Sequence, residues 1–254
     1  MKLLLVADLH YTLRQWDWLK SVAEQFDLIV IAGDLLDIAS IVSQEAQIVV
    51  IRKYLQRLAP GPPVLVSSGN HDVLSPTEGD AKTAAWLQHE RRDQLFVDGD
   101  HYEQDGLFFS LLPWWETEDD VARIEVLLEE HAIRAAGKQW IWIYHPPPKQ
   151  RTVAWNGRAD WGDQHAGRWI ERFKPEMVLS GHVHQAPFVR DGAWIDEING
   201  TWLFNSGRQP GSVPTFTVID TEKDHAIWIS AEDAQQARLV LPLECRPLEG
   251  PLRL

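Results

Sequence analysis

Carboxylate and imidazole side chains directly follow short apolar runs at five places in this chain. The apolar runs have the length and composition of buried strands and cover residues 3–7, 28–32, 64–67, 140–144 and 177–180. The polar groups after them are Asp8-Leu9-His10, Gly33-Asp34 with Asp37, Gly69-Asn70-His71-Asp72, His145, and Gly181-His182-Val183-His184. In open α/β sheets, ligands bind outside the carboxyl ends of the strands. The pattern therefore predicts an α/β fold in which these side chains converge at one sheet edge.

Segments with helical spacing of apolar residues separate the predicted strands, which favours α/β layering. Helices are predicted over residues 13–26, 41–58, 77–90 and 117–136. After His184 the pattern changes to hairpins, with strands predicted over residues 194–198, 201–205, 215–220 and 225–230. Because no repeat or low-complexity linker divides the chain, we expect one domain over residues 1–241 and an extended surface tail over residues 242–254.

Composition and charge limit the classes of protein that this chain can belong to. The 254 residues are 44% hydrophobic, which is enough for a sizeable core. The formal charge of −13 disfavours binding to nucleic acid or anionic lipid. The single cysteine, Cys245, suits a reducing compartment. The apolar start ends at Asp8, short of the ~7–15 residues of a signal-peptide core, and no run reaches the ~20 residues of a membrane span. We therefore expect a cytoplasmic protein that contacts no membrane.

The residue types at the strand ends suit a pair of metal ions. A carboxylate can bridge two cations, and neutral imidazoles suit Mn, Fe or Zn. Strand side chains alternate with a period of two, so Asp8 and His10 face one way, as do His182 and His184. A metal pair roughly 3.5–4 Å apart can stabilise both the attacking and the leaving oxygen of a phosphoryl displacement. The glycine that precedes three of the clusters is expected to let the backbone turn tightly there.

The ordered set D-x-H, G-D-x-x-D, G-N-H-D, a single H after a strand, and G-H-x-H resembles the calcineurin-like metallophosphoesterase superfamily. The likeness extends from Asp8 to His184. It implies an α/β fold with two facing mixed β-sheets flanked by helices, a four-layer sandwich. It also implies a hydrolase that acts on phosphoric ester bonds through two metal ions and a bridging hydroxide. Mn or Fe are the expected metals, with Zn as an alternative.

The resemblance assigns a role to each residue of the set. Two metal shells result: Asp8, His10 and His184 for the first metal, Asn70, His145 and His182 for the second, and Asp34 shared by both. His71 would stay off the metals and protonate the leaving group or stabilise charge on the phosphate. Asp37 would orient His71, since a carboxylate at one ring nitrogen fixes the tautomer. Because no ligand of the set is missing, catalysis is favoured over a scaffold role.

Substrate contacts are expected in the loops beside the strand ends. The segment 146–163 leaves the strand that ends at His145, and loops of this length are often functional, so we expect a lid over the metals. Arginine can bind phosphate oxygens bidentately, and tryptophans crowd the same loops. The candidate substrate-binding residues are Arg14, Trp115, Arg158 and Arg208. The histidines of charged helical stretches, His89 and His131, are expected to be solvated.

Three other functions compete with a small-molecule phosphoesterase. A nuclease of the same superfamily would share every metal ligand, although the charge of −13 disfavours it. A protein phosphatase is suggested by Gly33-Asp34-x-x-Asp37, but Ile38 and Asp72 stand where that branch has arginine and glutamate. A non-catalytic interaction module is the third. We therefore predict hydrolysis of a small-molecule phosphomonoester or phosphodiester; the sequence decides neither between these two nor the oligomeric state.

Overall fold

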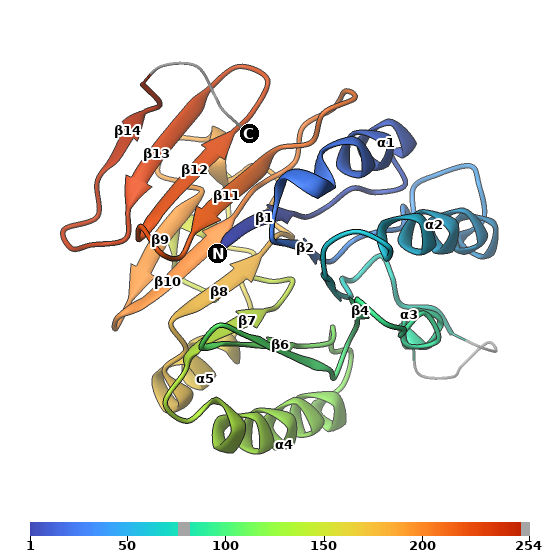
Figure 1. Cartoon of the computed structure of the whole chain (residues 1–254), viewed down its shortest axis with the longest axis horizontal. Coiled ribbons are helices and arrows are strands. Elements are labelled where there is room, and N and C mark those ends of the chain that lie inside the picture. Colours follow the sequence, from blue (N-terminus) through green and yellow to red (C-terminus); the bar gives the residue numbers. More distant parts are fainter. Residues whose placement is uncertain (76–81, 250–254) are drawn as a thin grey trace.

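The computed structural model describes residues 1–75 and 82–249. Within these residues, the strands form an eight-stranded and a six-stranded sheet, and helices cover the outer face of each (Figure 1). Three apolar clusters fill the spaces between the resulting layers. The expected α/β fold with two facing mixed sheets flanked by helices is confirmed.

The large sheet has the strand order β14-β13-β12-β11-β1-β2-β3-β4. Its parallel part comprises β1 (Lys2–Val6), β2 (Leu28–Ala32), β3 (Val64–Ser67) and β4 (Leu95–Phe96). Its antiparallel part comprises β11 (Phe216–Asp220), β12 (His225–Ile229), β13 (Ala234–Arg238) and β14 (Cys245–Pro247). Because β1, β2 and β3 run in the same direction, the loops that follow them leave from one edge of the sheet.

The small sheet has the strand order β5-β6-β7-β8-β10-β9. Its parallel strands are β6 (Leu107–Leu111), β7 (Gln139–Ile143), β8 (Met177–Ser180) and β10 (Thr201–Asn205). The antiparallel strands at its two edges are β5 (His101–Gln104) and β9 (Ile195–Ile198). The loops after β7 and β8 therefore also leave from a common edge.

Helices cover the outer face of each sheet. The large sheet packs against α1 (Leu13–Val22), η1 (Ala23–Gln25), α2 (Gln44–Leu58) and α3 (Ala85–Gln88). The small sheet packs against α4 (Glu118–Ala135) and α5 (Ala166–Phe173). Two single 3₁₀ turns, η2 (Thr152–Ala154) and η3 (Ala186–Phe188), lie in the loops after β7 and β8. No helix in the described part of the chain is long and apolar enough to cross a membrane.

Strand β1 shows why the apolar runs form a layered core. Its side chains alternate, so Leu3 and Leu5 pack toward the small sheet while Leu4 and Val6 pack toward the helices. All four are fully buried, and each buried side chain of this size contributes roughly 1.5–3 kcal/mol relative to exposure. The apolar layer between the sheets places the two sets of strand ends close together.

Two sequence-based expectations about local structure are wrong. The helix predicted over residues 77–90 is reduced to α3, because Leu74 and Thr83 exchange backbone hydrogen bonds of 2.9 and 3.0 Å that require extended chain; residues 77–81 of that prediction lie outside the described residues. His131, expected to be solvated, is 4% exposed, because its Nδ1 atom bonds Ser110 Oγ at 2.9 Å between α4 and β6.

The two outermost antiparallel strands of the large sheet, β13 and β14, were not predicted. Strand β13 reads Ala-Gln-Gln-Ala-Arg and lacks the β-branched and aromatic residues that indicate a strand. Strand β14 is exposed, lies within residues 242–254, and pairs with β13. This part of the predicted tail therefore joins the large sheet.

Candidate metal centre

The structure brings all seven predicted metal ligands together where the parallel strands of the two sheets end. The loops after β1, β2 and β3 supply Asp8, His10, Asp34 and Asn70, and the loops after β7 and β8 supply His145, His182 and His184. Asp8 and His145 are fully buried and Asp34 is 1% exposed, whereas Asn70, His182 and His184 are partly exposed. Each sheet therefore contributes side chains to one compact site.

Four residues form one group of potential ligands: Asp8, His10, Asp34 and His184. One ligand atom from each lies within 4.8 Å of the others. His184 Nε2 lies 3.2 Å from Asp8 Oδ1 and 3.0 Å from His10 Nε2. Imidazole nitrogens and carboxylate oxygens directed at a common point are a ligand set that suits Mn, Fe or Zn.

A second group joins the first through Asp34. His145 Nε2 lies 3.2 Å from Asp34 Oδ2, and His10 Nε2 of the first group lies 3.5 Å from the same oxygen. His182 Nδ1 lies 3.0 Å from Asn70 Oδ1, and the His182 and His145 rings are 5.2 Å apart. Asp34 therefore contacts imidazoles of both groups, as a shared carboxylate must.

His145 tests whether this ligand set fits a metal ion. Its Nδ1 atom donates to the Ala32 carbonyl at 2.7 Å, which leaves Nε2 directed at the cluster. This Nε2 atom is buried and makes no hydrogen bond of good geometry to any described residue. Buried polar atoms are nearly always satisfied, and metal-ligating histidines commonly bond a carbonyl through the other nitrogen. The residues present fit a bound metal.

The electrostatics of the cluster also favour a cation. Burial opposes protonation of His145, but the carboxylates of Asp34 and Asp8 outweigh it and raise the pKa of His145 to about 9. Burial likewise opposes ionisation of Asp8 and Asp34, yet the neighbouring imidazoles lower the pKa of both carboxyls. The two buried carboxylates therefore require positive charge beside them. A bound metal ion would supply that charge in place of the proton, because a ligating imidazole must be neutral.

Four of the seven ligand residues have a left-handed backbone. The φ angles are 55° for Asp8, 41° for His10, 55° for Asp34 and 68° for His182. Residues other than glycine rarely adopt such angles, and each instance costs on the order of 1–3 kcal/mol unless the surroundings impose it. Strain of this kind collects at functional sites. Nothing in the sequence pattern indicated it.

The glycines before the clusters serve two different purposes. Gly33 has a φ of 86°, in keeping with the expected tight turn. Gly69 and Gly181 do not have a positive φ, and their role is to leave space. A Cβ atom on Gly69 would lie 2.2 Å from Asp34 Oδ1, and one on Gly181 would lie 2.4 Å from Asp8 Oδ2. Both carboxylates thus occupy volume that any other residue would fill.

His71 lies beside the cluster, and the backbone around it sets its orientation. The Ile38 N–H donates to His71 Nδ1 at 3.3 Å, and Gln44 Nε2 donates to the His71 carbonyl at 2.9 Å. His71 Nε2 faces the cluster, 3.9 Å from Asp34 Oδ2. Burial lowers the pKa of His71, although the carboxylate of Asp34 acts in the opposite sense.

Asp37, the expected partner of His71, lies close to it. One Asp37 carboxylate oxygen is within 4.8 Å of ring nitrogens of His71 and His10. That carboxylate accepts a hydrogen bond from the Ala39 N–H at 2.9 Å, and no hydrogen bond joins it to His71 within the described residues. The bond to the Ile38 N–H, instead, holds the His71 ring.

Sequence reasoning placed Asp72 near the site but gave it no role; the structure shows that it connects two of the ligand-bearing loops. Its buried carboxylate accepts hydrogen bonds from Leu35 N at 2.9 Å, Leu36 N at 3.0 Å and Gly69 N at 2.9 Å. Burial raises the pKa of Asp72 to about 8, while these backbone donors act against the shift. Its position directly after Asn70 and His71 was the one available signal. Asp72 fixes the loops after β2 and β3 relative to each other.

The structure separates the four candidate substrate-binding residues into two pairs. Arg208 lies at the cluster, where its Nε donates to the Asp8 carbonyl at 3.1 Å and its backbone N–H to the His184 carbonyl at 3.1 Å. Trp115 lines a cavity beside His182. Arg14 and Arg158 are exposed, and within the described part of the chain no hydrogen bond or ion pair joins their guanidinium groups to the cluster.

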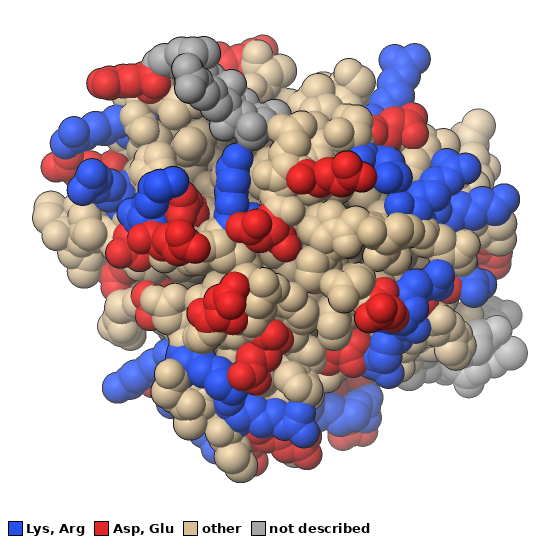
Figure 2. All heavy atoms as spheres, in the orientation of Figure 1, with Lys and Arg blue, Asp and Glu red and all other residues tan. Residues whose placement is uncertain are grey.

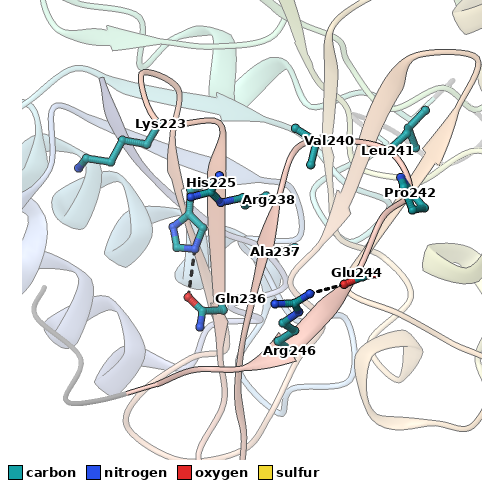
Figure 3. Close-up of a pocket in the computed structure, with 10 residues that line it drawn as sticks. All are labelled: Lys223, His225, Gln236, Ala237, Arg238, Val240, Leu241, Pro242, Glu244 and Arg246. Carbon is teal, nitrogen blue, oxygen red and sulfur yellow. Dashed lines mark hydrogen bonds and ion pairs between the residues drawn. The ribbon is translucent and has the colours of Figure 1, made fainter.

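Two cavities differ in their relation to the cluster. The larger, about 610 Å³, lies between the β12–β13 hairpin and the segment leading into β14, and its lining includes no residue of the cluster (Figure 3). The smaller, about 280 Å³, is lined by His182, by Trp114 and Trp115, and by the two ends of segment 146–163. Only the smaller of these two cavities therefore adjoins the candidate metal centre.

Comparison with known proteins gives the family. Residues 1–186 match the profile of the calcineurin-like phosphoesterase family, and the chain belongs to that family. The resemblance inferred from the motifs is thereby confirmed. The chain is therefore a member of a phosphoesterase superfamily. Its own buried Asp/His cluster can bind metal. No curated protein matches the sequence.

Solved structures share the fold at low sequence identity. Purple acid phosphatase PPD1 from yellow lupin (Lupinus luteus) seeds is 14% identical with a TM-score of 0.56, over 94% of this chain and 51% of that one, so this chain spans about half its length. GAP50, the anchor in the inner membrane complex of Plasmodium, is 10% identical with a TM-score of 0.51, over 98% and 88%. These likenesses establish the fold alone.

Proposed function

We propose that this chain is a metal-dependent phosphoesterase that hydrolyses a small-molecule phosphate ester at a centre of two metal ions, Mn or Fe. The observation that carries the proposal is the position of Asp34. Its Oδ2 atom lies 3.5 Å from His10 Nε2 and 3.2 Å from His145 Nε2, so one carboxylate adjoins both groups of ligands. Asp8 and His184 would complete the first site, and Asn70 and His182 the second.

When bound, metals in such a pair activate water for attack on phosphorus and neutralise charge on the phosphate. Other groups of the chain position the metal ligands and the substrate. Asp72 and the Ala32 carbonyl hold the ligands in place, because they bond the loops after β2 and β3 and the His145 ring. Arg208 lies where its guanidinium can contact a phosphate oxygen while its Nε holds the Asp8 backbone.

His71 acts on the leaving oxygen. Its Nδ1 accepts the Ile38 N–H, so the proton of the neutral ring is on Nε2, which faces the cluster. From there the Nε2–H of the neutral ring can donate a hydrogen bond to the phosphate or to the departing oxygen. As a general acid the ring must first be the imidazolium, which transfers its Nε2 proton to the alkoxide and is left neutral. General acid–base catalysis of this kind contributes roughly 10²–10⁴ in rate.

The charge of the chain supports a small-molecule substrate over a nucleic acid. The formal charge is −13, and acidic and basic side chains are intermixed over the face drawn in Figure 2. The fold is also compatible with a non-catalytic role, since GAP50 is described as an anchor. The proposal therefore rests on the side-chain cluster and not on the fold.

The test is a combined measurement of metal content and hydrolysis. The purified full chain is loaded with Mn or Fe, analysed for metal, and assayed on paired phosphomonoester and phosphodiester substrates. We expect bound metal and metal-dependent hydrolysis, both lost in Asp34→Asn. Asp191→Asn changes a carboxylate whose side chain is 80% exposed, and it should retain both. Metal-loaded protein that hydrolyses neither class of ester would overturn the proposal.

A further inference from the structure

The cavity beside His182 has walls of three indole rings, those of Trp114, Trp115 and Trp161. Trp114 also contacts the candidate metal ligands directly, with its ring 5.4 Å from that of His182 and 6.0 Å from that of His145. The cavity therefore adjoins the candidate metal ligands directly. The term indole cavity is used below for this space.

Hydrogen bonds hold two of the indoles and use up their polar atoms. Trp114 Nε1 donates to Glu116 Oε1 at 2.7 Å, and the Trp114 backbone N–H donates to Ser68 Oγ at 3.0 Å. Trp115 Nε1 donates at 2.6 Å to Oδ2 of Asp163, a carboxylate that is 6% exposed. Since both N–H groups are engaged, these rings can offer a ligand only their apolar surfaces.

The third wall belongs to segment 146–163. The two ends of segment 146–163 are paired, with Lys149 N donating to the Asp163 carbonyl at 2.9 Å and Asp163 N to the Pro147 carbonyl at 2.8 Å. A Cβ atom on Gly162 would lie 2.6 Å from the Lys149 backbone, which shows how closely the ends approach. The backbone N–H of Trp161 donates to the Ala154 carbonyl at 2.9 Å, within the same segment. Hydrogen bonds within the segment itself therefore hold this wall in place.

Trp161 presents a large apolar surface to solvent. The residue is 55% exposed, which makes it the one tryptophan among the large hydrophobic residues that are exposed in the described part of the chain. Covering the exposed indole with a flat apolar group removes apolar surface from water, which stabilises the bound state. The cavity volume of about 280 Å³ lies near the lower limit of small-molecule pockets, roughly 300 Å³. One ring system fits that space.

We infer that the indole cavity binds a planar aromatic ring carried by the phosphoester, so that the chain prefers arylmethyl, aryl or nucleoside esters to saturated ones. This inference rests on the proposed function, because it takes the phosphate to be held at the cluster. Lys149 and Gln164 also line the cavity and can bond polar atoms at the edge of the ring. Trp161 is then a specificity-determining residue.

The test compares two esters that differ in the ring and not in the type of alcohol released. Benzyl phosphate and cyclohexylmethyl phosphate, with their methyl diesters, all release a primary alcohol. We expect kcat/KM of the metal-loaded full chain to be about tenfold higher for the benzyl esters, the ratio that stacking on aromatic side chains supplies. Uridine monophosphate against ribose phosphate forms a second pair. A larger ratio in the second pair identifies a nucleoside as the preferred group.

Variants assign the preference to the indole cavity. Trp161→Leu should bring the benzyl ratio close to one, and Trp161→Phe should retain most of it, because phenylalanine keeps an aromatic face. Trp155→Leu is the matched control, since Trp155 belongs to the same segment and does not line the cavity. Circular dichroism checks that each variant is folded. Equal kcat/KM for both members of both pairs in the wild-type chain would overturn the inference and leave the proposed function intact.

A binding measurement separates this inference from the proposed function. Benzylphosphonate and cyclohexylmethylphosphonate have no ester bond to hydrolyse, and calorimetry gives their Kd for the metal-loaded chain. We expect benzylphosphonate to bind about tenfold more tightly, and Trp161→Leu to remove the difference. If no ester is hydrolysed but this difference is found, the proposed function fails and the inference stands. If the two phosphonates bind equally and neither substrate pair shows a preference, the inference fails.

Discussion

The two sheets contribute different chemistry to the candidate centre. The large sheet supplies all of its oxygen ligands, Asp8, Asp34 and Asn70, together with the imidazole of His10. The small sheet supplies imidazoles alone, from His145, His182 and His184. The carboxylates thus lie on one side of the interface between the sheets, and most of the imidazoles lie on the other.

This difference shows that neither sheet holds a charge-balanced site by itself. Asp8 and Asp34 are both buried. The pKa of Asp8 is lowered by His10 of its own sheet and by His184 and His145 of the small sheet, and that of Asp34 is lowered most by His145. The apolar layer between the sheets, which includes Leu5 and Ile143, places the two sets of ligands face to face. Metal binding and the packing of the sheets should therefore depend on each other.

The largest effect is expected when one imidazole of the small sheet is removed, which tests whether the centre needs ligands from both sheets. His145→Gln should lower hydrolysis to the buffer background and reduce bound metal as much as Asp34→Asn does, because the second site then keeps only Asp34, Asn70 and His182. Kinetic assays and elemental analysis of the two variants measure this. A His145→Gln protein that retains its metal and its rate would show that the centre does not need this imidazole of the small sheet.

His71 sharpens the comparison, because it belongs to the large sheet and is expected not to bind metal. His71→Ala should lower kcat by roughly 10²–10⁴, the usual share of general acid–base catalysis. Its metal content should equal that of the wild type. Both quantities can be measured on one preparation. Loss of metal together with activity would make His71 a ligand and contradict its assignment.

Removal of metal should loosen the packing between the sheets. A ligand at a free concentration of about 1,000 Kd stabilises the folded state by about 4 kcal/mol, which for a chain of this length corresponds to roughly 10 °C in Tm. Thermal unfolding with metal and with a chelator measures the difference. Asp34→Asn is the control and should show little change on chelation. An equal chelator effect in both proteins would place the metal elsewhere.

His131 tests a buried imidazole on the small-sheet side that lies outside the centre. Burial lowers the pKa of His131 to about 4. As the pH falls below about 6.5, the unfolded chain takes up a proton that the folded chain does not, so stability decreases with falling pH. At pH 5 the loss is about 2 kcal/mol. Urea denaturation between pH 7 and 5 should show this loss in the wild type and not in His131→Gln. An identical pH dependence of the two proteins would contradict it.

The layered fold was predictable because the determining signals are local in sequence. Each buried parallel strand is a short apolar run followed by a polar group, as at Asp8 and His145. This pattern can be recognised without knowing which strands pair with each other. Strand β13 was missed for the opposite reason. Its glutamines and alanines become a strand because β12 offers unpaired backbone groups beside them, which is a tertiary effect.

The site divides in the same way. Ligand types and their order along the chain could be read from the sequence, but their support could not. The hydrogen bonds of Asp72 reach residues more than thirty positions away. The pairing of Trp115 with Asp163 and the contact of Trp114 with His182 likewise depend on how loops of different strands meet. The left-handed backbone of Asp8 and Asp34 is imposed by the folded surroundings and has no local signature.

Gly69 and Gly181 have a consequence for protein design. A designer who copied the ligands onto another pair of sheets would naturally keep the histidines and aspartates and treat the intervening positions as free. Alanine at either glycine position would put a methyl carbon within 2.4 Å of a carboxylate oxygen of Asp34 or Asp8. A transplanted centre would then hold every ligand and still have no room for two of them. A design that transfers this centre must therefore transfer the two glycines together with the metal ligands.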